Sequence, residues 1–240
     1  MTFEHTPTMS VEEYFQLEEN NPDTRYEYLD GYVYMMSGGS ANHATISGNI
    51  YAILKSLLRG GPCRAYNSDM KVRVSEKRYV HPDVTVSCDA RDRGTADFIQ
   101  SPRLVVEVLS PSTEAYDRGR KLQYYVACST IEEYLLVDSR SMRIEIYRKE
   151  QKKWMYDAFE AGDTVELASL GVRFSAIDVY EDVAFEKEGN ICHGTGSCRG
   201  STAAGYVAAT RTRAFGRPGT TCTGRPADPA FIWGQRGDYR

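Results

Sequence analysis

Leu104-Val105-Val106-Glu107-Val108-Leu109 is the stretch of sequence that decides the fold. Its apolar residues fill both the odd and the even positions, so the pattern predicts a strand buried on both faces at the centre of a sheet. Glu107 stands in the middle of this strand, where an unpaired carboxylate is costly to bury. The side chain must therefore be neutral, paired with a cation or bound to a metal, and the strand alone favours a structural ion pair and a functional site equally.

The segments on either side of this strand predict a mixed α/β fold. Ser10-Val11-Glu12-Glu13 is a capping box that starts a helix, and Asp30-Gly31 between two aromatic-rich runs is typical of a tight hairpin turn. Helices are predicted at residues 10–19, 41–59 and 113–127, and strands at 25–29, 32–36, 70–74, 84–86, 104–109, 133–137, 144–148, 153–158, 164–167 and 172–174. This order indicates an α+β arrangement, a mixed sheet flanked by helices.

The overall composition is that of a globular protein. The 240 residues are 41% hydrophobic and 26% charged, which excludes a disordered or collagen-like chain. No run approaches the roughly 18 apolar residues of a membrane span, and the first residues lack the pattern of a signal peptide. A cytoplasmic protein that does not contact membranes is therefore expected.

The last 51 residues differ in composition from the rest of the chain. Residues 190–240 contain seven Arg, no Lys, two Asp and nine of the twenty Gly. With little apolar periodicity, this segment is predicted to be a disordered Arg/Gly-rich tail, and its composition also fits a shifted reading frame or an appended sequence. Residues 1–189 then form one domain with a net charge of −9.

The cysteines raise the question of metal binding. Cys63, Cys88 and Cys128 are isolated in segments that resemble strands or helix ends, and such residues are expected to be reduced core side chains in a cytoplasmic protein. In the tail, a zinc site would draw on Cys192, His193, Cys198 and Cys222. Their spacing matches no paired Cys-x₂₋₄-Cys arrangement, so structural zinc is not favoured.

Asp83 supplies a second carboxylate near the start of a predicted strand, in His81-Pro82-Asp83-Val84. Val84 is expected to face the core and Asp83 the opposite side. A Pro-Asp pair alone is common in turns. Beside Glu107 on a neighbouring strand, however, Asp83 would complete a two-carboxylate site suited to Mg²⁺, which takes oxygen ligands and retains several waters.

The helix that follows Glu107 brings a cation to the same region. Asp117, Lys121 and Tyr125 are four residues apart and share one helical face. Lys121 could lean over the end of the Glu107 strand and offset negative charge on a phosphate. The alternative for Lys121 is an exposed ion pair with Asp117.

These residues together carry a resemblance to a known family. Pro82-Asp83, Glu107-Val108-Leu109 and Lys121-x-x-x-Tyr125 resemble the PD-(D/E)XK restriction-endonuclease-like superfamily. A closer similarity, to the Uma-type restriction endonucleases, covers about residues 9–183. It rests on five motifs that occur in order: Met9-Ser10-Val11-Glu12-Glu13-Tyr14, Tyr26-Glu27-Tyr28-Leu29-Asp30-Gly31, His81-Pro82-Asp83-Val84, Glu107-Val108-Leu109-Ser110-Pro111-Ser112-Thr113 and Glu133-Tyr134-Leu135-Leu136-Val137-Asp138.

The resemblance implies a restriction-endonuclease-like core and a divalent-metal phosphodiesterase acting on DNA, with Mg²⁺ or Mn²⁺ as cofactor. Asp83 and Glu107 would be the metal ligands and Glu27 a possible third carboxylate. The superfamily has Lys two residues after the Glu, whereas this chain has Leu109 there, so Lys121 would be the migrated catalytic lysine. The resemblance also implies a homodimer. His43 would contact substrate or only make a hydrogen bond at the start of its helix.

The negative charge of residues 1–189 argues against strong non-specific binding to DNA. A local basic surface would be needed, and the candidates are Lys71, Arg73, Lys77 and Arg78, with Arg118, Arg120 and Lys121 on the helix. Each group is also compatible with an ordinary solvated surface. The alternative function is a scaffold or partner-binding module that keeps the nuclease fold and has lost efficient chemistry.

Overall fold

The computed structural model describes residues 8–36 and 38–185. The predicted tail at 190–240, with its four Cys and His candidates for zinc, lies outside the described residues. The helices are α1 (Val11–Asn20), α2 (Ala41–Leu57), α3 (Glu114–Tyr116) and α4 (Leu122–Ala127), with a π-helical turn at Asp117–Lys121 and 3₁₀ turns at Ala90–Asp92 and Ala176–Tyr180. The strands are β1 (Tyr26–Leu29), β2 (Tyr32–Met35), β3 (Arg64–Asn67), β4 (Val72–Ser75), β5 (Arg78–Val80), β6 (Val84–Ser87), β7 (Pro102–Leu109), β8 (Glu133–Asp138), β9 (Arg143–Glu150), β10 (Lys153–Glu160), β11 (Thr164–Leu167) and β12 (Val172–Ser175).

The strands form one large mixed sheet and two smaller sheets. The large sheet has the order β10-β9-β8-β7-β6-β3, the second has the order β2-β1-β5-β4, and β11 pairs with β12. All pairs in the large sheet are antiparallel except β7 with β8. The prediction of a mixed sheet flanked by helices is confirmed, with β7 in the interior of the sheet as its apolar sequence indicates.

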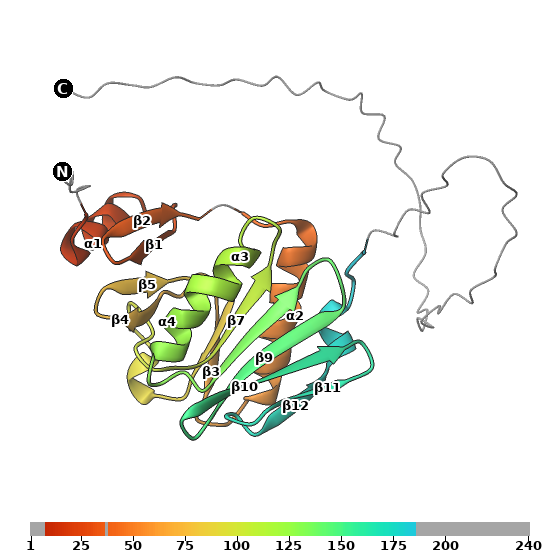
Figure 1. Cartoon of the computed structure of the whole chain (residues 1–240). Helices are drawn as coiled ribbons and strands as arrows, with labels where there is room; N and C mark the ends of the chain where they lie inside the picture. Colours follow the sequence, from red (N-terminus) through yellow and green to blue (C-terminus); the bar gives the residue numbers. More distant parts are fainter. Residues whose placement is uncertain (1–7, 37, 186–240) are drawn as a thin grey trace, which may run out of the picture. The chain divides into compact units, whose positions relative to one another are not determined.

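Helix α2 lies on one face of the large sheet and α4 on the other (Figure 1), and a hydrophobic cluster is buried on each face. On one face, Leu104, Val106 and Val108 of β7 pack in the same cluster as Ile46, Ile50 and Leu54 of α2. On the other face, Val105 and Leu109 cluster with Tyr125 of α4. Because successive side chains of a strand alternate between faces, Glu107 points to the same side as Val105 and Leu109, toward the segment that carries Lys121.

The N-terminal segment folds as its local signals predict. Ser10 Oγ accepts from the Glu13 N–H, and Glu13 Oε2 accepts from the Ser10 N–H at 2.7 Å. Asp30 and Gly31 adopt φ angles of 54° and 96°, the positive values that the tight turn between β1 and β2 requires. Tyr14 of α1 packs on Tyr28 and Tyr79, which fastens the helix to the second sheet.

The predicted continuous helix at 113–127 is wrong in detail. The structure has one turn of α-helix, then the π-helical turn at Asp117–Lys121, then α4. Gly119 lies in the middle of the wide turn and has no side chain to pack there. β3 and β5 were not predicted, because the first is a short polar strand after Gly-Gly-Pro and the second has only three residues.

The expectation of reduced core cysteines is wrong for two of the three. Cys63 and Cys88 form a disulfide, whereas Cys128 is free and half-buried. The cause is strand register: β3 pairs antiparallel with β6, with Arg64 opposite Ser87. The next position outward puts Cys63 opposite Cys88, a relation between distant segments that local sequence does not reveal.

Candidate active site

Strand pairing places the two predicted carboxylates side by side. β6 and β7 are antiparallel with Val84 opposite Val106, so the next position along this register sets Asp83 opposite Glu107. Directly opposed residues have Cβ atoms about 4.5–5.5 Å apart. Asp83 Oδ2 also accepts a hydrogen bond of 2.7 Å from the Val108 N–H, which fixes the carboxylate against β7.

Glu107 is buried and accepts two hydrogen bonds on one oxygen. Lys121 Nζ lies 3.0 Å from Glu107 Oε1, and Tyr125 Oη donates to the same oxygen at 2.7 Å. Burial raises the pKa of Glu107 to about 8, against the attraction of Lys121 and with the repulsion of Asp117, Asp83 and Glu27. Burial thus favours the protonated form of this carboxyl group unless a cation compensates its charge.

Three carboxylates surround the single ammonium group of Lys121. Its Nζ lies 3.0 Å from Glu27 Oε1, 3.0 Å from Glu107 Oε1 and 3.8 Å from Asp117 Oδ1. Burial alone would lower the pKa of Lys121, but these carboxylates outweigh it and hold the pKa well above its ordinary value. Lys121 therefore stays charged, and carboxyl groups outnumber ammonium groups around it.

The predicted supporting residues lie in the same cluster. Asp117 is buried, which raises its pKa despite the nearby Lys121. His43 Nε2 lies 3.3 Å from Asp83 Oδ2, and this hydrogen bond raises the pKa of His43. The backbone N–H of His43 also donates to Ser40 Oγ at the helix start, which is the hydrogen bond considered in the sequence analysis; the contact of His43 with substrate stays a prediction.

His81 is a member of this site that the sequence analysis did not single out. It is 5% exposed, and its backbone N–H donates to Glu27 Oε1 at 3.2 Å. Nδ1 lies 3.0 Å from the Ser68 carbonyl oxygen, which can only accept, so Nδ1 carries the proton. The sequence does hold one indication of this role, because His81 is only two residues before Asp83.

The cluster opens onto a cleft of about 310 Å³. Asp83, Glu107 and Lys121 line one part of it, and Ser110 and Thr113 line another. The acidic groups and the lysine are thus reachable from solvent even though the side chains are largely buried.

The candidate basic surfaces are mostly occupied by ion pairs. Lys71 pairs with Glu18, Arg73 with Glu76, Arg78 with Asp30, and Arg118 with Glu114 and Glu145. Within residues 8–36 and 38–185, Lys77 and Arg120 form no ion pair within 4.0 Å. Of these candidates among the described residues, only Lys77 and Arg120 are therefore free of an ion pair and available for phosphates.

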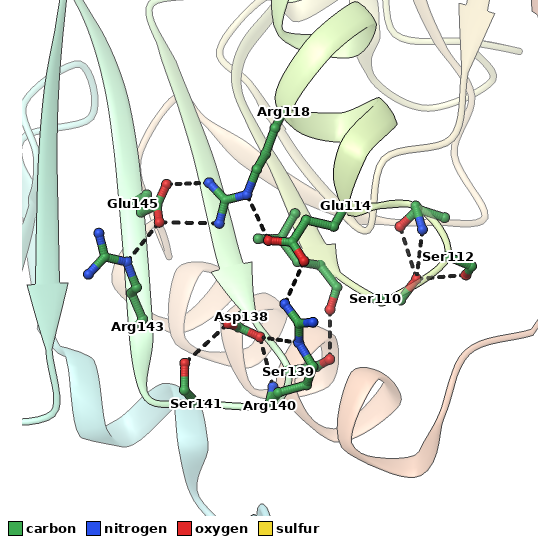
Figure 2. Close-up of polar contacts among 12 residues, drawn as sticks. Ser110, Ser112, Glu114, Arg118, Asp138, Ser139, Arg140, Ser141, Arg143 and Glu145 are labelled. Carbon is green, nitrogen blue, oxygen red and sulfur yellow. Dashed lines mark hydrogen bonds and ion pairs between the residues drawn. The ribbon is translucent and has the colours of Figure 1, made fainter.

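Figure 2 shows an ion-pair network that ties the helical segment bearing Lys121 to β8 and β9. Arg118 Nη1 lies 2.6 Å from Glu145 Oε2, and Arg118 Nε lies 2.9 Å from Glu114 Oε1. Arg140 contacts the other oxygen of Glu114. Because Arg118 is three residues before Lys121, this network helps to fix the direction of the lysine.

Removing Arg118 should therefore cost more stability than removing Arg140. Burial would raise the pKa of Glu145, but Arg118 and Arg143 lower it below its usual value. Arg118→Gln leaves the buried Glu145 with Arg143 as its remaining ion-pair partner. We therefore expect the free energy of unfolding to fall by about 1–3 kcal/mol. Arg140→Gln, at a more exposed pair, should cost less than about 1 kcal/mol. Urea unfolding at pH 7 measures both, and equal losses would contradict the anchoring role.

Sequence comparison identifies the family. The model of the Uma2 family, described as "Putative restriction endonuclease", matches residues 11–179. The chain belongs to the Uma2 family. A Synechocystis protein described as uncharacterized is 45% identical over 181 residues, covering 75% of this chain and 95% of its own. A second uncharacterized Synechocystis protein is 29% identical over 154 residues, covering 62% of this chain and 86% of its own.

A solved structure shares the fold of this Uma2 chain. It is described as a "putative nuclease belonging to DUF820" from Anabaena variabilis, with a TM-score of 0.61 and 18% identity. The match covers 72% of this chain and 98% of the other. The Uma2 description and the shared fold together indicate a restriction-endonuclease-like nuclease.

No group of three or more His, Cys, Asp or Glu side chains within 8–36 and 38–185 is arranged to hold a metal ion. The same part of the chain has no helix long and apolar enough to cross a membrane.

Proposed function

We propose that this protein is a divalent-metal-dependent endonuclease that hydrolyses phosphodiester bonds of DNA at the Asp83–Glu107–Lys121 cluster. The observation that carries the proposal is the excess of buried carboxylates over cations. Glu27, Glu107 and Asp117 surround one ammonium group, and Asp83 lies across the strand pair from Glu107. A further cation would relieve this repulsion.

The donor atoms fit a hard cation such as Mg²⁺ or Mn²⁺. They are carboxylate oxygens, and Mg²⁺ is commonly held by one or two carboxylates with waters and phosphate completing the shell. Both hydrogen bonds to Glu107 end on Oε1, which leaves Oε2 for a metal. We assign Asp83 and Glu107 as ligands; Glu27 would become a third ligand only after its side chain moves, because no three such side chains among the described residues are already arranged around one metal position. When bound, the metal would acidify a water and neutralise charge on the phosphate.

The remaining residues have positioning roles in this proposal. Lys121 would orient the attacking water or offset charge on the phosphate, as a buried ammonium can do without further reorganisation. Asp117 and Tyr125 hold Lys121 and Glu107 in place, and His43 holds Asp83. A homodimer, which would present two such sites to two strands, is part of the proposal.

Calorimetric titration with Mg²⁺ and Mn²⁺ tests the metal site. Wild type should bind, and Asp83→Asn should bind at least about tenfold more weakly, because one of two charged ligands is lost. Asp89→Asn is the matched control, since Asp89 follows the other end of β6 and pairs with Arg91. Absence of metal binding in wild type would favour the non-catalytic scaffold. That alternative is supported by Leu109, which occupies the position where the superfamily has its lysine.

A further inference from the structure

A second cavity, of about 470 Å³, adjoins the candidate active site. Its volume is within the range of about 300–1,000 Å³ typical of small-molecule sites. The two cavities share four lining residues: Met36, Thr113, Asp117 and Lys121. The rest of the second cavity is lined by Glu27, Tyr34, Met35, Tyr116 and Arg120. The same lysine thus forms a wall of both spaces.

Aromatic and thioether side chains form part of the lining of this cavity, namely Tyr34, Met35, Met36 and Tyr116. Tyr34 and Met35 of β2 are 49% and 70% exposed, unusual values for large apolar side chains. The strand register sets Tyr34 opposite Glu27, so both side chains project from one face of the hairpin. Tyr116 also lines the cavity, and its ring centre lies 5.9 Å from Lys121 Nζ. A flat group between Tyr34 and Tyr116 would lie next to the catalytic cluster.

The distribution of charge argues for a ligand recognised through its bases. Affinity for duplex DNA depends on Lys and Arg side chains that neutralise phosphates. Residues 1–189 have a net charge of −9, and Lys71, Arg73, Arg78 and Arg118 are already ion-paired. Stacking of bases on aromatic rings does not need that charge, but the bases of a duplex stack on one another and are not available to the protein.

We propose that this cavity binds an unpaired nucleobase, so that the substrate is single-stranded DNA or a single-stranded segment of DNA. The base would stack against Tyr34 and Tyr116, and Arg120 at the rim would face an adjacent phosphate. The phosphodiester on the other side of Lys121 would then reach Asp83 and Glu107. The choice of DNA, and the presence of a bond to be cut, rest on the proposed function.

Fluorescence anisotropy in EDTA tests the cavity without any cleavage. The ligands are a labelled oligothymidylate of about 12 nucleotides, a duplex of the same length and the matching oligouridylate. Wild type should bind the single-stranded DNA at least about tenfold more tightly than the duplex, and Tyr34→Ala should weaken the single-strand binding by about tenfold. Tyr116→Phe keeps the ring, and its hydroxyl is buried without a partner among the described residues, so it should bind as wild type does.

Tyr156→Ala is the matched control. Tyr156 is 48% exposed on β10 and is outside the lining of the cavity, so its removal should change binding less than about twofold. Equal losses in Tyr34→Ala and Tyr156→Ala would overturn the proposal. So would duplex binding as tight as single-strand binding, or tighter binding of the oligouridylate than of the oligothymidylate.

The outcome is separable from the proposed nuclease function. A protein that binds single strands through Tyr34 but never cleaves DNA with Mg²⁺ or Mn²⁺ supports the cavity and counts against the nuclease. A protein that cleaves duplex DNA with metal and is indifferent to Tyr34→Ala supports the nuclease and overturns the cavity.

Discussion

Glu107→Gln is expected to reduce metal-dependent DNA cleavage by about a thousandfold or more while the fold is kept. In the proposed metal site, loss of a charged ligand would remove several kcal/mol of transition-state stabilisation, and each 1.36 kcal/mol corresponds to a factor of ten. Gln has the shape of the protonated carboxyl group, so Tyr125 and Lys121 keep a polar partner. The measurement is cleavage of single-stranded and duplex substrates with Mg²⁺ and Mn²⁺, with circular dichroism to check folding.

Glu132→Gln is the control for this substitution. Glu132 is part of an exposed ion pair with Arg103 outside the cleft, so the variant should cleave at the wild-type rate. Cleavage that survives Glu107→Gln at a wild-type rate would remove Glu107 from the reaction.

Glu107→Gln should also change the pH dependence of stability in the metal-free protein. Burial raises the pKa of Glu107 to about 8, above its value in the unfolded chain. The stability that this group contributes is then fully present at pH values below its unfolded pKa and is lost as the pH rises through about 8. Since Gln does not ionise, Glu107→Gln should lose this part of the pH dependence.

Lys121→Met is expected to lower the free energy of unfolding by about 3–5 kcal/mol at pH 8, because it strands buried carboxylates without their cation. The loss should shrink toward pH 5. Burial raises the pKa of both Glu107 and Asp117, and without Lys121 these groups take up protons more readily still. Wild-type Lys121, whose pKa is raised well above its usual value, stays charged throughout this range.

Urea unfolding at pH 5 and pH 8 measures this difference. Lys55→Met, at an exposed lysine of α2, should cost less than about 0.5 kcal/mol at either pH. If Lys121→Met lowers the free energy of unfolding by the same amount at both pH values, the charge of Lys121 does not stabilise the three carboxylates, contrary to what their geometry indicates.

The sequence reveals the parts of this site that depend on local patterns. The apolar run around Glu107 predicts an interior strand, and β7 is one. The spacing of Asp117, Lys121 and Tyr125 predicts a shared direction, and two of the three side chains contact Glu107 directly. Lys121 and Tyr125 still lie on one face of the helix, because the π-helical turn ends at Lys121 and the residues that follow form the regular helix α4.

The parts that the sequence does not reveal depend on pairing between distant segments. The disulfide between Cys63 and Cys88 follows from the register of β3 with β6. Likewise, Lys71 and Arg78 are candidates for binding DNA in the sequence, but the structure pairs them with Glu18 and Asp30. Such contacts join residues 25 to 53 positions apart, and no periodicity within one segment encodes them.

The positions in the chain of Lys121 and of the carboxylates near it bear on the order in which the site forms during synthesis. Glu27 comes from the hairpin, Asp83 and Glu107 from paired strands of the large sheet, and Lys121 from the segment after them. During synthesis Glu27, Asp83 and Glu107 emerge before Lys121, which pairs with Glu27 and Glu107. The buried carboxylates therefore gain this ion-pair partner only after residue 121 has left the ribosome. Because β8, the parallel partner of β7, comes later still, the charged cluster is enclosed in its sheet only after most of the domain has been synthesised.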